Sequence, residues 1–222
     1  MLVTEDLGLC GIKIYQDDEL YRFTSDSVLL SRFAKAKKGD VVADFCSGSG
    51  IVGFNFYGLN APLVDSVTFF EMQKPLFDLS VKSIERNGLS DKFSAVKCKV
   101  QEIDKNFYGK FSLVLCNPPY MSAASGAHDK SETVAICKRE IALNVLELAK
   151  AISLTLKFGG RTCIVYRADR LADVLCALRA VNLEPKRLQL VEAAGKEPYL
   201  FMVEAVKGGK SGIKILRNAE NR

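Results

Sequence analysis

The sequence lacks the paired cysteines and multiple histidines that build zinc sites. It contains one histidine and seven cysteines, at positions 10, 46, 98, 116, 137, 163 and 176, and no two of them form a C-x-x-C pair. Several of these cysteines lie inside apolar runs, where a free thiol behaves as a small hydrophobic group. An odd, scattered set of cysteines with a single histidine argues against a zinc site and for a reducing compartment.

Long hydrophobic runs are also missing. No apolar stretch approaches the roughly 18–20 residues that a membrane-spanning helix needs. Residues 1–6 lack the basic flank and the apolar segment of a secretory signal. We therefore expect a cytoplasmic protein that does not contact a membrane, and a monomer is the favoured oligomeric state.

The chain has 222 residues, of which 48% are hydrophobic and 26% charged, as expected for one soluble domain with a sizeable core. Its net charge of +5 is uneven. Up to Asn117 there are 14 Lys and Arg against 15 Asp and Glu, a net of −1, and from Pro118 onward 17 against 11, a net of +6. The excess indicates either a nucleic-acid-binding face in the second half or a solvated mixed surface.

Apolar segments of strand and helix type alternate along the chain. Strands are expected at residues 41–46, 66–71, 93–98, 111–116, 162–166, 187–191 and 199–206, and helices between them include 133–158, ended by Gly159-Gly160, and 169–181. This order predicts an α/β fold: a Rossmann-like, doubly wound, mostly parallel seven-stranded sheet with helices on both faces. The last two strands leave no room for a helix between them, so we expect an antiparallel C-terminal hairpin with one reversed strand at the sheet edge.

Three regions are expected. Residues 1–38 form an N-terminal preface with one helix, which begins near Ser25. Residues 39–207 form the main domain. Residues 208–222 form a basic tail, which is flexible by composition because it begins Gly208-Gly209-Lys210-Ser211-Gly212.

A glycine-rich turn follows the first expected strand. Gly48, Gly50 and Gly53 match G-x-G-x-x-G, a dinucleotide-binding pattern. Asp44 precedes these glycines, where its carboxylate would attract an ammonium or sulfonium group and repel a pyrophosphate. Glu71 ends the next strand, where it can accept hydrogen bonds from both hydroxyls of a ribose. A tight turn with no ligand, and an ordinary capping role for Asp44, are the alternatives.

Asn117-Pro118-Pro119-Tyr120 follow the strand expected at residues 111–116. The two prolines fix two φ angles and provide no N–H donors, so their carbonyls are rigid acceptors. The Asn117 oxygen and the Pro118 carbonyl would accept the two hydrogens of a planar amine, and Tyr120 would stack on the attached ring. A proline turn without chemical use is the alternative.

Together these motifs resemble the class I S-adenosylmethionine-dependent methyltransferases, and the N-P-P-Y turn resembles those that methylate a planar nitrogen. Further stretches resemble the tRNA1(Val) adenine-N6 methyltransferase family: residues 21–30, 183–188, 194–199 and 203–210. The resemblance covers nearly the whole chain. It implies S-adenosyl-L-methionine as cofactor, tRNA as partner, and methylation of an adenine N6 just 3′ of the anticodon.

The resemblance also implies a set of site residues. The catalytic residues would be Asn117, Pro118, Pro119 and Tyr120. Cofactor binding would involve Asp44, Cys46, Ser47, Gly48, Gly50, Glu71, Met72, Val100 and Asn117. Substrate contacts would come from Tyr120 and from four candidate phosphate-binding cations, Arg139, Lys186, Arg187 and Lys196. No metal is expected.

The sequence departs from the family pattern at two places. Many relatives carry an acidic residue at the end of the third strand that holds the adenine amine of the cofactor, whereas this chain has Lys99 and Gln101 there. Either a backbone group or Gln101 takes that role, or the affinity for the cofactor is lower than in those relatives. Relatives often have Ala-Arg-His-Glu after the catalytic turn, and this chain has Cys137-Lys138-Arg139-Glu140.

Alternatives stay open on the residues alone. The same amine geometry exists in a protein glutamine, in guanine N2 and in cytosine N4. A non-catalytic RNA-binding module with a relic cofactor fold is a second possibility, and an oxidoreductase based on the glycine pattern is a third. Residues 121–130 are small and flexible and would form a lid over substrate, with His128 as a solvent-facing loop residue.

Overall fold

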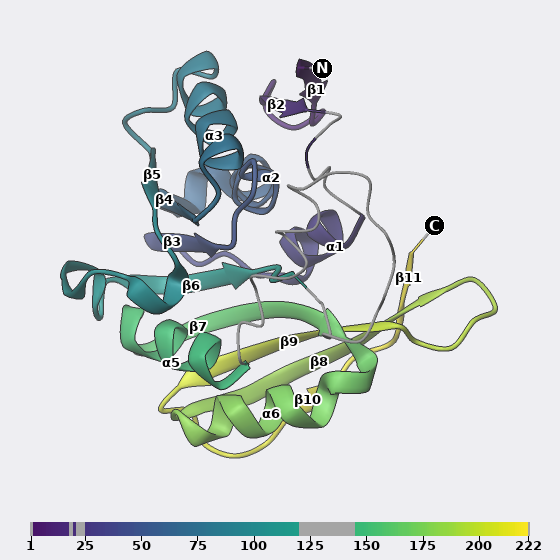
Figure 1. The fold of residues 1–222 in the computed structure, drawn as a ribbon. Coiled ribbons are helices and arrows are strands. Elements are labelled where there is room, and N and C mark those ends of the chain that lie inside the picture. Colours follow the sequence, from purple (N-terminus) through teal and green to yellow (C-terminus); the bar gives the residue numbers. More distant parts are fainter. Residues whose placement is uncertain (1, 18–19, 21–24, 120–144, 222) are drawn as a thin grey trace.

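The computed structural model describes residues 2–17, 20, 25–119 and 145–221. Figure 1 shows a central sheet with helices on both faces and a separate two-stranded hairpin near the N-terminus. The strands are β1 (Leu2–Asp6), β2 (Lys13–Asp17), β3 (Asp40–Phe45), β4 (Val64–Glu71), β5 (Phe93–Lys97), β6 (Phe111–Cys116), β7 (Leu156–Arg167), β8 (Leu183–Ala193), β9 (Leu200–Lys207), β10 (Lys214–Ile215) and β11 (Ala219–Asn221). The helices are α1 (Ser25–Phe33), α2 (Ile51–Asn60), α3 (Lys74–Arg86), α5 (Val145–Thr155) and α6 (Leu171–Ala180).

The central sheet confirms the doubly wound, mostly parallel Rossmann-like fold. Its strand order is β10-β8-β9-β7-β6-β3-β4-β5, and β11 also pairs with β8. Helices α1, α2 and α3 cover one face, and α5 and α6 cover the other (Figure 1). Two apolar cores follow from this arrangement, one on each face. All six residues of β6 are buried, which explains why the strand is apolar except for Ser112, whose hydroxyl is hydrogen-bonded.

The reversed strand lies inside the sheet, so its expected place at the edge was wrong. β9 pairs antiparallel with both β7 and β8. The hairpin itself was predicted correctly, but its second strand, β9, lies between β8 and β7. β8 also begins earlier than expected and continues through Pro185, where the register with β9 shifts. A proline is tolerated in a strand at such an irregularity.

The tail adds strands where we expected flexibility. β10 and β11 both pair parallel with β8, which brings the sheet to nine strands instead of seven. These short pairings cover an edge that would otherwise expose unpaired backbone groups. The domain boundaries at residues 38 and 207 remain predictions.

The expected helix over residues 133–158 ends earlier. α5 ends at Thr155, and the next residue, Leu156, already pairs with Phe111 of β6. Gly159 has a φ of 74°, and a Cβ on Gly160 would lie 2.8 Å from the Lys157 carbonyl oxygen, so the chain bends sharply at this pair. The part of the expected helix before residue 145 lies outside the described residues.

A hairpin of β1 and β2 occupies the N-terminal preface and was not predicted. Asn87, just after α3, fixes it by accepting a hydrogen bond from the Lys13 N–H at 2.9 Å and donating one to the Lys13 carbonyl at 2.7 Å. The Tyr15 N–H donates to the Ser83 hydroxyl at 2.9 Å. Ile14 is completely buried in the core on the same face. A two-stranded sheet is marginal alone, so these contacts hold it in place.

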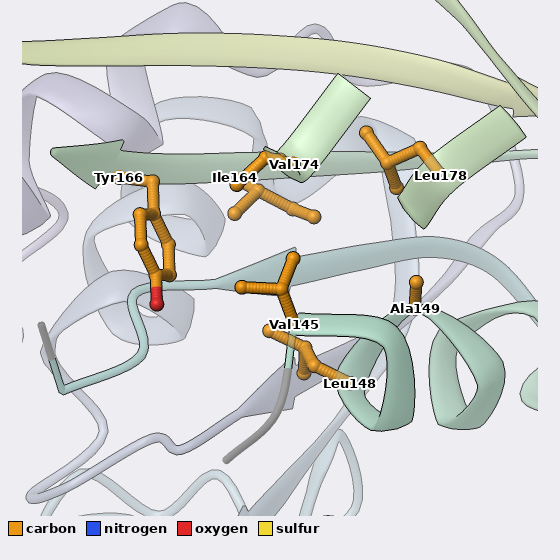
Figure 2. Close-up of a pocket in the computed structure, with 7 residues that line it drawn as sticks. All are labelled: Val145, Leu148, Ala149, Ile164, Tyr166, Val174 and Leu178. Atoms are coloured by element: carbon orange, nitrogen blue, oxygen red, sulfur yellow. The ribbon is translucent and has the colours of Figure 1, made fainter. Parts of the chain in front are cut away.

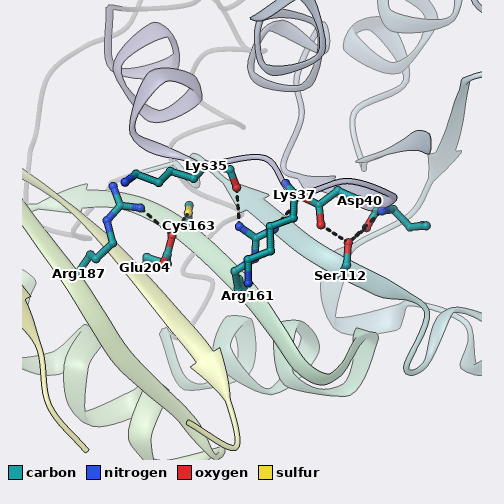
Figure 3. A network of polar contacts seen from close by, with 9 residues as sticks. Lys35, Lys37, Asp40, Ser112, Arg161, Cys163, Arg187 and Glu204 are labelled. Atoms are coloured by element: carbon teal, nitrogen blue, oxygen red, sulfur yellow. Dashed lines mark hydrogen bonds and ion pairs between the residues drawn. The ribbon is translucent and has the colours of Figure 1, made fainter. Parts of the chain in front are cut away.

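A buried ion pair links the start of the sheet to the preface (Figure 3). The Arg161 guanidinium donates to Asp40 at 2.6 Å and to the Lys35 carbonyl at 2.5 Å. Ser112 donates to the second Asp40 oxygen at 2.7 Å, and the Lys37 N–H also donates to this carboxylate at 2.7 Å. Each charge therefore has several partners, which a buried ion pair requires.

Among the described helices, none is long and apolar enough to cross a membrane.

Candidate active site

The carboxyl ends of β3, β4 and β6 meet at one edge of the sheet. Phe45 of β3 is in register with Phe70 of β4 on one side and with Cys116 of β6 on the other. Asp44, Glu71 and Asn117 each lie within one residue of these three positions. In open α/β sheets this edge is where ligands bind.

The glycine loop between β3 and α2 is a tight turn with several left-handed residues. Cys46, Gly48 and Gly50 have φ values of 56°, 57° and 90°. Such a φ is unusual for a residue with a side chain, and it marks Cys46 as a constrained position. A Cβ on Gly50 would lie 2.8 Å from the Phe69 ring, whereas a Cβ on Gly48 would meet nothing within 4 Å. Gly50 is needed for packing, while Gly48 borders open space that a ligand can occupy.

Asp44 is buried directly beneath this loop. Its Oδ2 accepts a hydrogen bond from the Gly53 N–H at 2.8 Å. Its Oδ1 has no hydrogen-bond partner in the described part of the chain. The pKa of Asp44 is raised to about 8, mainly by burial and also by the nearby Glu71 carboxylate, while the Gly53 hydrogen bond acts in the opposite direction. A cation beside Oδ1 would stabilise the ionised form.

Glu71 joins the end of β4 to the glycine loop. Its Oε2 accepts from the Gly48 N–H at 2.8 Å, and its Oε1 accepts from the Gln73 N–H at 2.8 Å. Burial raises the pKa of Glu71, and hydrogen bonds from the backbone of Gln73, Gly48 and Met72 lower it. Each carboxylate oxygen has a second lone pair, so this geometry still allows two hydroxyl donors such as those of a ribose.

Unsatisfied polar atoms gather around the same loop. In the described residues, four buried side-chain atoms lack a hydrogen-bond partner, and three of them belong to Gln16, Asp44 and Ser47. Gln16, on β2, also places its Nε2 3.4 Å from the Ser49 hydroxyl of the loop. Buried polar atoms normally have partners, so this grouping indicates a site that a polar, cationic ligand completes. The donor set fits S-adenosyl-L-methionine, which has an ammonium, a sulfonium and ribose hydroxyls.

The acceptor turn, which begins with Asn117 and Pro118, follows β6. Asn117 is half-buried and Pro118 is buried. The Asn117 side-chain nitrogen donates to the Ser27 hydroxyl at 2.9 Å, so the amide oxygen lies on the other branch of the amide. Tyr120, expected to stack on the substrate ring, lies outside the described residues, as do His128 and the rest of the expected lid.

The end of the third strand shows no acid that replaces the one typical of relatives. Val100 is buried in η2 (Val100–Glu102), the short helix after β5. Gln101 is exposed, and Glu102 pairs with Lys99 at 3.7 Å on the surface. The Cys98 N–H donates to the Glu71 carbonyl at 3.1 Å, which keeps this segment next to the site.

The candidate phosphate contacts are placed differently from one another. Arg187 pairs with Glu204 at 2.8 Å (Figure 3). It also donates to the Phe33 carbonyl at 3.1 Å and stacks over the Phe33 ring. It therefore serves the junction of β8, β9 and α1. Lys186 donates to the Lys210 carbonyl at 2.9 Å. Lys196 is exposed in the turn between β8 and β9, and Arg139 lies outside the described residues.

Two polar residues at the site were missed by the sequence analysis, Gln16 and Ser27. Ser27 lies within the stretch of residues 21–30 that carries the family resemblance, so a signal existed for it. Gln16 had no such signal, because a single glutamine in a short polar strand looks like a surface residue. Only the fold of the preface brings both of them to the glycine loop and the acceptor turn.

A small apolar pocket lies on the opposite face of the sheet, between α5, α6 and the end of β7. Figure 2 shows its lining, which is Val145, Leu148, Ala149, Ile164, Tyr166, Val174 and Leu178. Burial raises the pKa of Tyr166. This lining offers a hydroxyl and no charged group, so it does not suit the ammonium or the ribose of the cofactor.

Comparison with known proteins agrees with this geometry. The family model "Methyltransferase small domain" matches residues 23–169. The chain is 24% identical to a tRNA1(Val) (adenine(37)-N6)-methyltransferase of Photobacterium profundum, over 87% of this chain and 76% of that protein. It is 22% identical to a protein of the same name from Bacteroides thetaiotaomicron, over 90% and 83%.

Solved structures share the fold. A predicted O-methyltransferase of Agrobacterium tumefaciens superposes with a TM-score of 0.68 at 16% identity, over 87% of this chain and 86% of that one. The tRNA m1G37 methyltransferase of M. jannaschii superposes with a TM-score of 0.62 at 14% identity, over 94% and 55%. The chain belongs to the methyltransferase small domain family, and it is a methyltransferase that uses S-adenosyl-L-methionine.

Proposed function

We propose that this methyltransferase methylates the exocyclic N6 amine of an adenine in tRNA, in the anticodon loop beside the anticodon. The observation that carries the proposal is the position of Asn117 and Pro118. Their acceptors lie at the end of β6, next to the glycine loop that ends β3. The names of the relatives from P. profundum and B. thetaiotaomicron support adenine N6 and tRNA as the target.

The acceptor turn would activate a weak nucleophile. The N6 amine of adenine is a poor nucleophile because its lone pair is delocalised into the ring. Acceptors at Asn117 and Pro118, placed outside the ring plane, draw the two amine hydrogens away and make the nitrogen more tetrahedral. This favours the transition state over the bound substrate, which is the requirement for catalysis. No strong base is needed, since the methylated ammonium is a strong acid.

The cofactor side supplies an electrophilic methyl group when S-adenosyl-L-methionine is bound. Asp44 offers its unpaired, buried Oδ1 to the cationic part of the cofactor. Glu71 would accept hydrogen bonds from the ribose hydroxyls, and the open space at Gly48 would admit the cofactor. A methyl donor held in this way beside the amine would gain much of the rate enhancement from proximity.

The tRNA partner fits the charge distribution. The half of the chain after Asn117 carries a net charge of +6. Lys196 is exposed and available to a phosphate, whereas Arg187 is already paired inside the protein. A loop base is partly unpaired before binding, so extruding it into a pocket costs little. Cytoplasmic tRNA would place the enzyme in the cytoplasm.

The test is Asn117→Ala with Asn106→Ala as a matched surface control. We expect the first variant to lose about 10²- to 10³-fold in kcat, because it lacks one preorganised transition-state contact, and to keep its cofactor affinity. The control retains normal kcat. The assay is labelled-methyl transfer to unmodified tRNA, followed by mass mapping of the modified nucleoside.

Two results would contradict the proposal. Normal methyl transfer by Asn117→Ala would remove the role of that amide. A methyl group found on guanine N2, on cytosine N4 or on a protein glutamine would keep the role of Asn117 and replace the substrate.

A further inference from the structure

Ser27 contacts the amide that carries the proposed chemistry. It lies in the first turn of α1, where it is only 2% exposed, and its hydroxyl accepts the hydrogen bond from the Asn117 side-chain nitrogen at 2.9 Å. The two residues are 90 positions apart in the chain. The contact therefore joins the preface directly to the acceptor turn.

The chemistry of an amide gives this contact a specific effect. The nitrogen end of a carboxamide only donates hydrogen bonds and the oxygen end only accepts them. A substrate amine needs the oxygen end. In the structure the buried Ser27 hydroxyl binds the nitrogen end, and in this orientation of Asn117 the oxygen lies on the other branch of the amide.

The helix that carries Ser27, α1, also contacts other elements. One turn later on α1, the Ser31 hydroxyl accepts from the Asn55 side chain of α2 at 2.7 Å and donates to the Val28 carbonyl at 2.8 Å. At the end of the helix, Arg187 stacks over the Phe33 ring with its guanidinium carbon 4.5 Å from the ring centre. These contacts attach the second half of α1 to α2 and β8.

We propose that Ser27 is a positioning residue, which orients the Asn117 amide so that its oxygen faces the amine being methylated. The proposal rests on the proposed function for the role of Asn117, but the contact itself does not. It also makes the N-terminal preface a part of the active site, although the preface precedes the glycine loop in the chain.

The kinetic test compares Ser27→Ala with Ser31→Ala. Both serines are buried hydroxyls on α1 that accept a hydrogen bond from an asparagine side chain, but only Ser27 binds Asn117. We expect Ser27→Ala to lower kcat by about tenfold or more, since a small misplacement of a reacting group is costly, with unchanged KM for the cofactor. Ser31→Ala lowers the denaturation midpoint and leaves kcat unchanged.

A double variant separates positioning from a general structural effect. In the Asn117→Ala background there is no amide to orient, so adding Ser27→Ala should cause no further loss of kcat. If Ser27→Ala is too unstable to purify, Ser27→Cys replaces the hydroxyl by a weak acceptor of similar size and should show the same kinetic loss. Equal kcat losses in the Ser27 and Ser31 variants would overturn the proposal.

A spectroscopic test does not depend on activity. The side-chain NH2 signals of Asn117 can be assigned by NMR from their loss in Asn117→Ala. Ser27→Ala should shift them, because the donor loses its acceptor, and Ser31→Ala should not. Unchanged signals would overturn the proposal. If the wild-type enzyme methylates no adenine, the proposed function fails, while these signals still decide whether Ser27 holds the amide.

Discussion

At the scale of single residues, the polar atoms of this protein differ sharply in how well they are satisfied. Asp44 and Asp40 are both buried aspartates at the two ends of β3. Asp40 has an arginine, a serine and a backbone N–H as partners, whereas Asp44 has one backbone N–H and an oxygen without a partner among the described residues. The incomplete satisfaction of Asp44 has a measurable consequence.

Asp44 makes cofactor affinity depend on pH. Its pKa of about 8 means that it is largely neutral at pH 6 in the free protein. A bound cation favours the ionised form, so binding at low pH must first remove a proton. We expect the dissociation constant to fall as pH rises from 6 to 8, by up to about tenfold per unit, and to level off above 8. Isothermal titration calorimetry at several pH values measures this dissociation constant.

Asp44→Asn is the control for this prediction. The variant cannot ionise at this position, so it should bind more weakly at pH 8. The cofactor has titrating groups of its own, but these affect both proteins and cancel in the ratio of the two dissociation constants. A ratio that stays constant between pH 6 and pH 8 would contradict the assigned role of Asp44.

At the scale of elements, the β1–β2 hairpin depends on contacts outside itself. The Asn87 side chain binds both backbone groups of Lys13, as a neighbouring strand would. It accepts from the Lys13 N–H at 2.9 Å and donates to the Lys13 carbonyl at 2.7 Å. Asn87→Ala removes both, and each net hydrogen bond is worth about 1 kcal/mol. We expect amide exchange in β1 and β2 to become faster by about tenfold or more, measured by hydrogen–deuterium exchange with mass spectrometry.

Exchange in the central sheet serves as the internal control. β3 and β6 should exchange at the wild-type rate, because the hairpin opens locally. Gln16 is on β2, so loosening the hairpin should also weaken cofactor binding through the glycine loop. Unchanged exchange in the hairpin would show that side-chain burial, led by Ile14, is enough to hold it.

The same elements show how far sequence reasoning reaches. The strands β3, β4, β5 and β6 and the glycine loop were predicted because their signals are local: continuous apolar runs, glycines and a terminal acid. The hairpin was missed because β1 and β2 are short and polar, and their stability comes from α3. The strands β10 and β11 were missed because they lie in a tail rich in Gly and Lys, which becomes extended only by pairing with the edge of β8.

The site shows a similar division. Asp44, Glu71 and Asn117 could be found because each ends a predictable strand. Gln16 and Ser27 could not be assigned, since their roles come from contacts 33 and 90 positions away in the chain. Arg187 looked like a free surface cation, and only the register of β8 with β9 reveals Glu204 as its partner.

At the scale of the whole molecule, the two ends of the sheet have different tasks. The carboxyl ends of β3, β4 and β6 carry the glycine loop, Glu71 and the acceptor turn. Near the glycine loop, buried side-chain atoms of Gln16, Asp44 and Ser47 have no hydrogen-bond partner among the described residues. At the amino end of β3, Arg161, Asp40 and Ser112 form a fully connected network. Stability is concentrated at one end so that the other can remain open to ligands.

This division predicts that Arg161→Ala affects folding and spares catalysis. Its side chain is 5% exposed and is paired with Asp40 at 2.6 Å, so removing it leaves a buried carboxylate without its cation. We expect a loss of about 3–5 kcal/mol in the free energy of unfolding, measured by urea denaturation. Arg170→Ala breaks an exposed pair with Asp173 and should cost less than about 1 kcal/mol. Below its melting transition, Arg161→Ala should bind cofactor with wild-type affinity, because the network does not touch the glycine loop; a cofactor affinity that fell along with stability would mean that the two ends of the sheet are coupled.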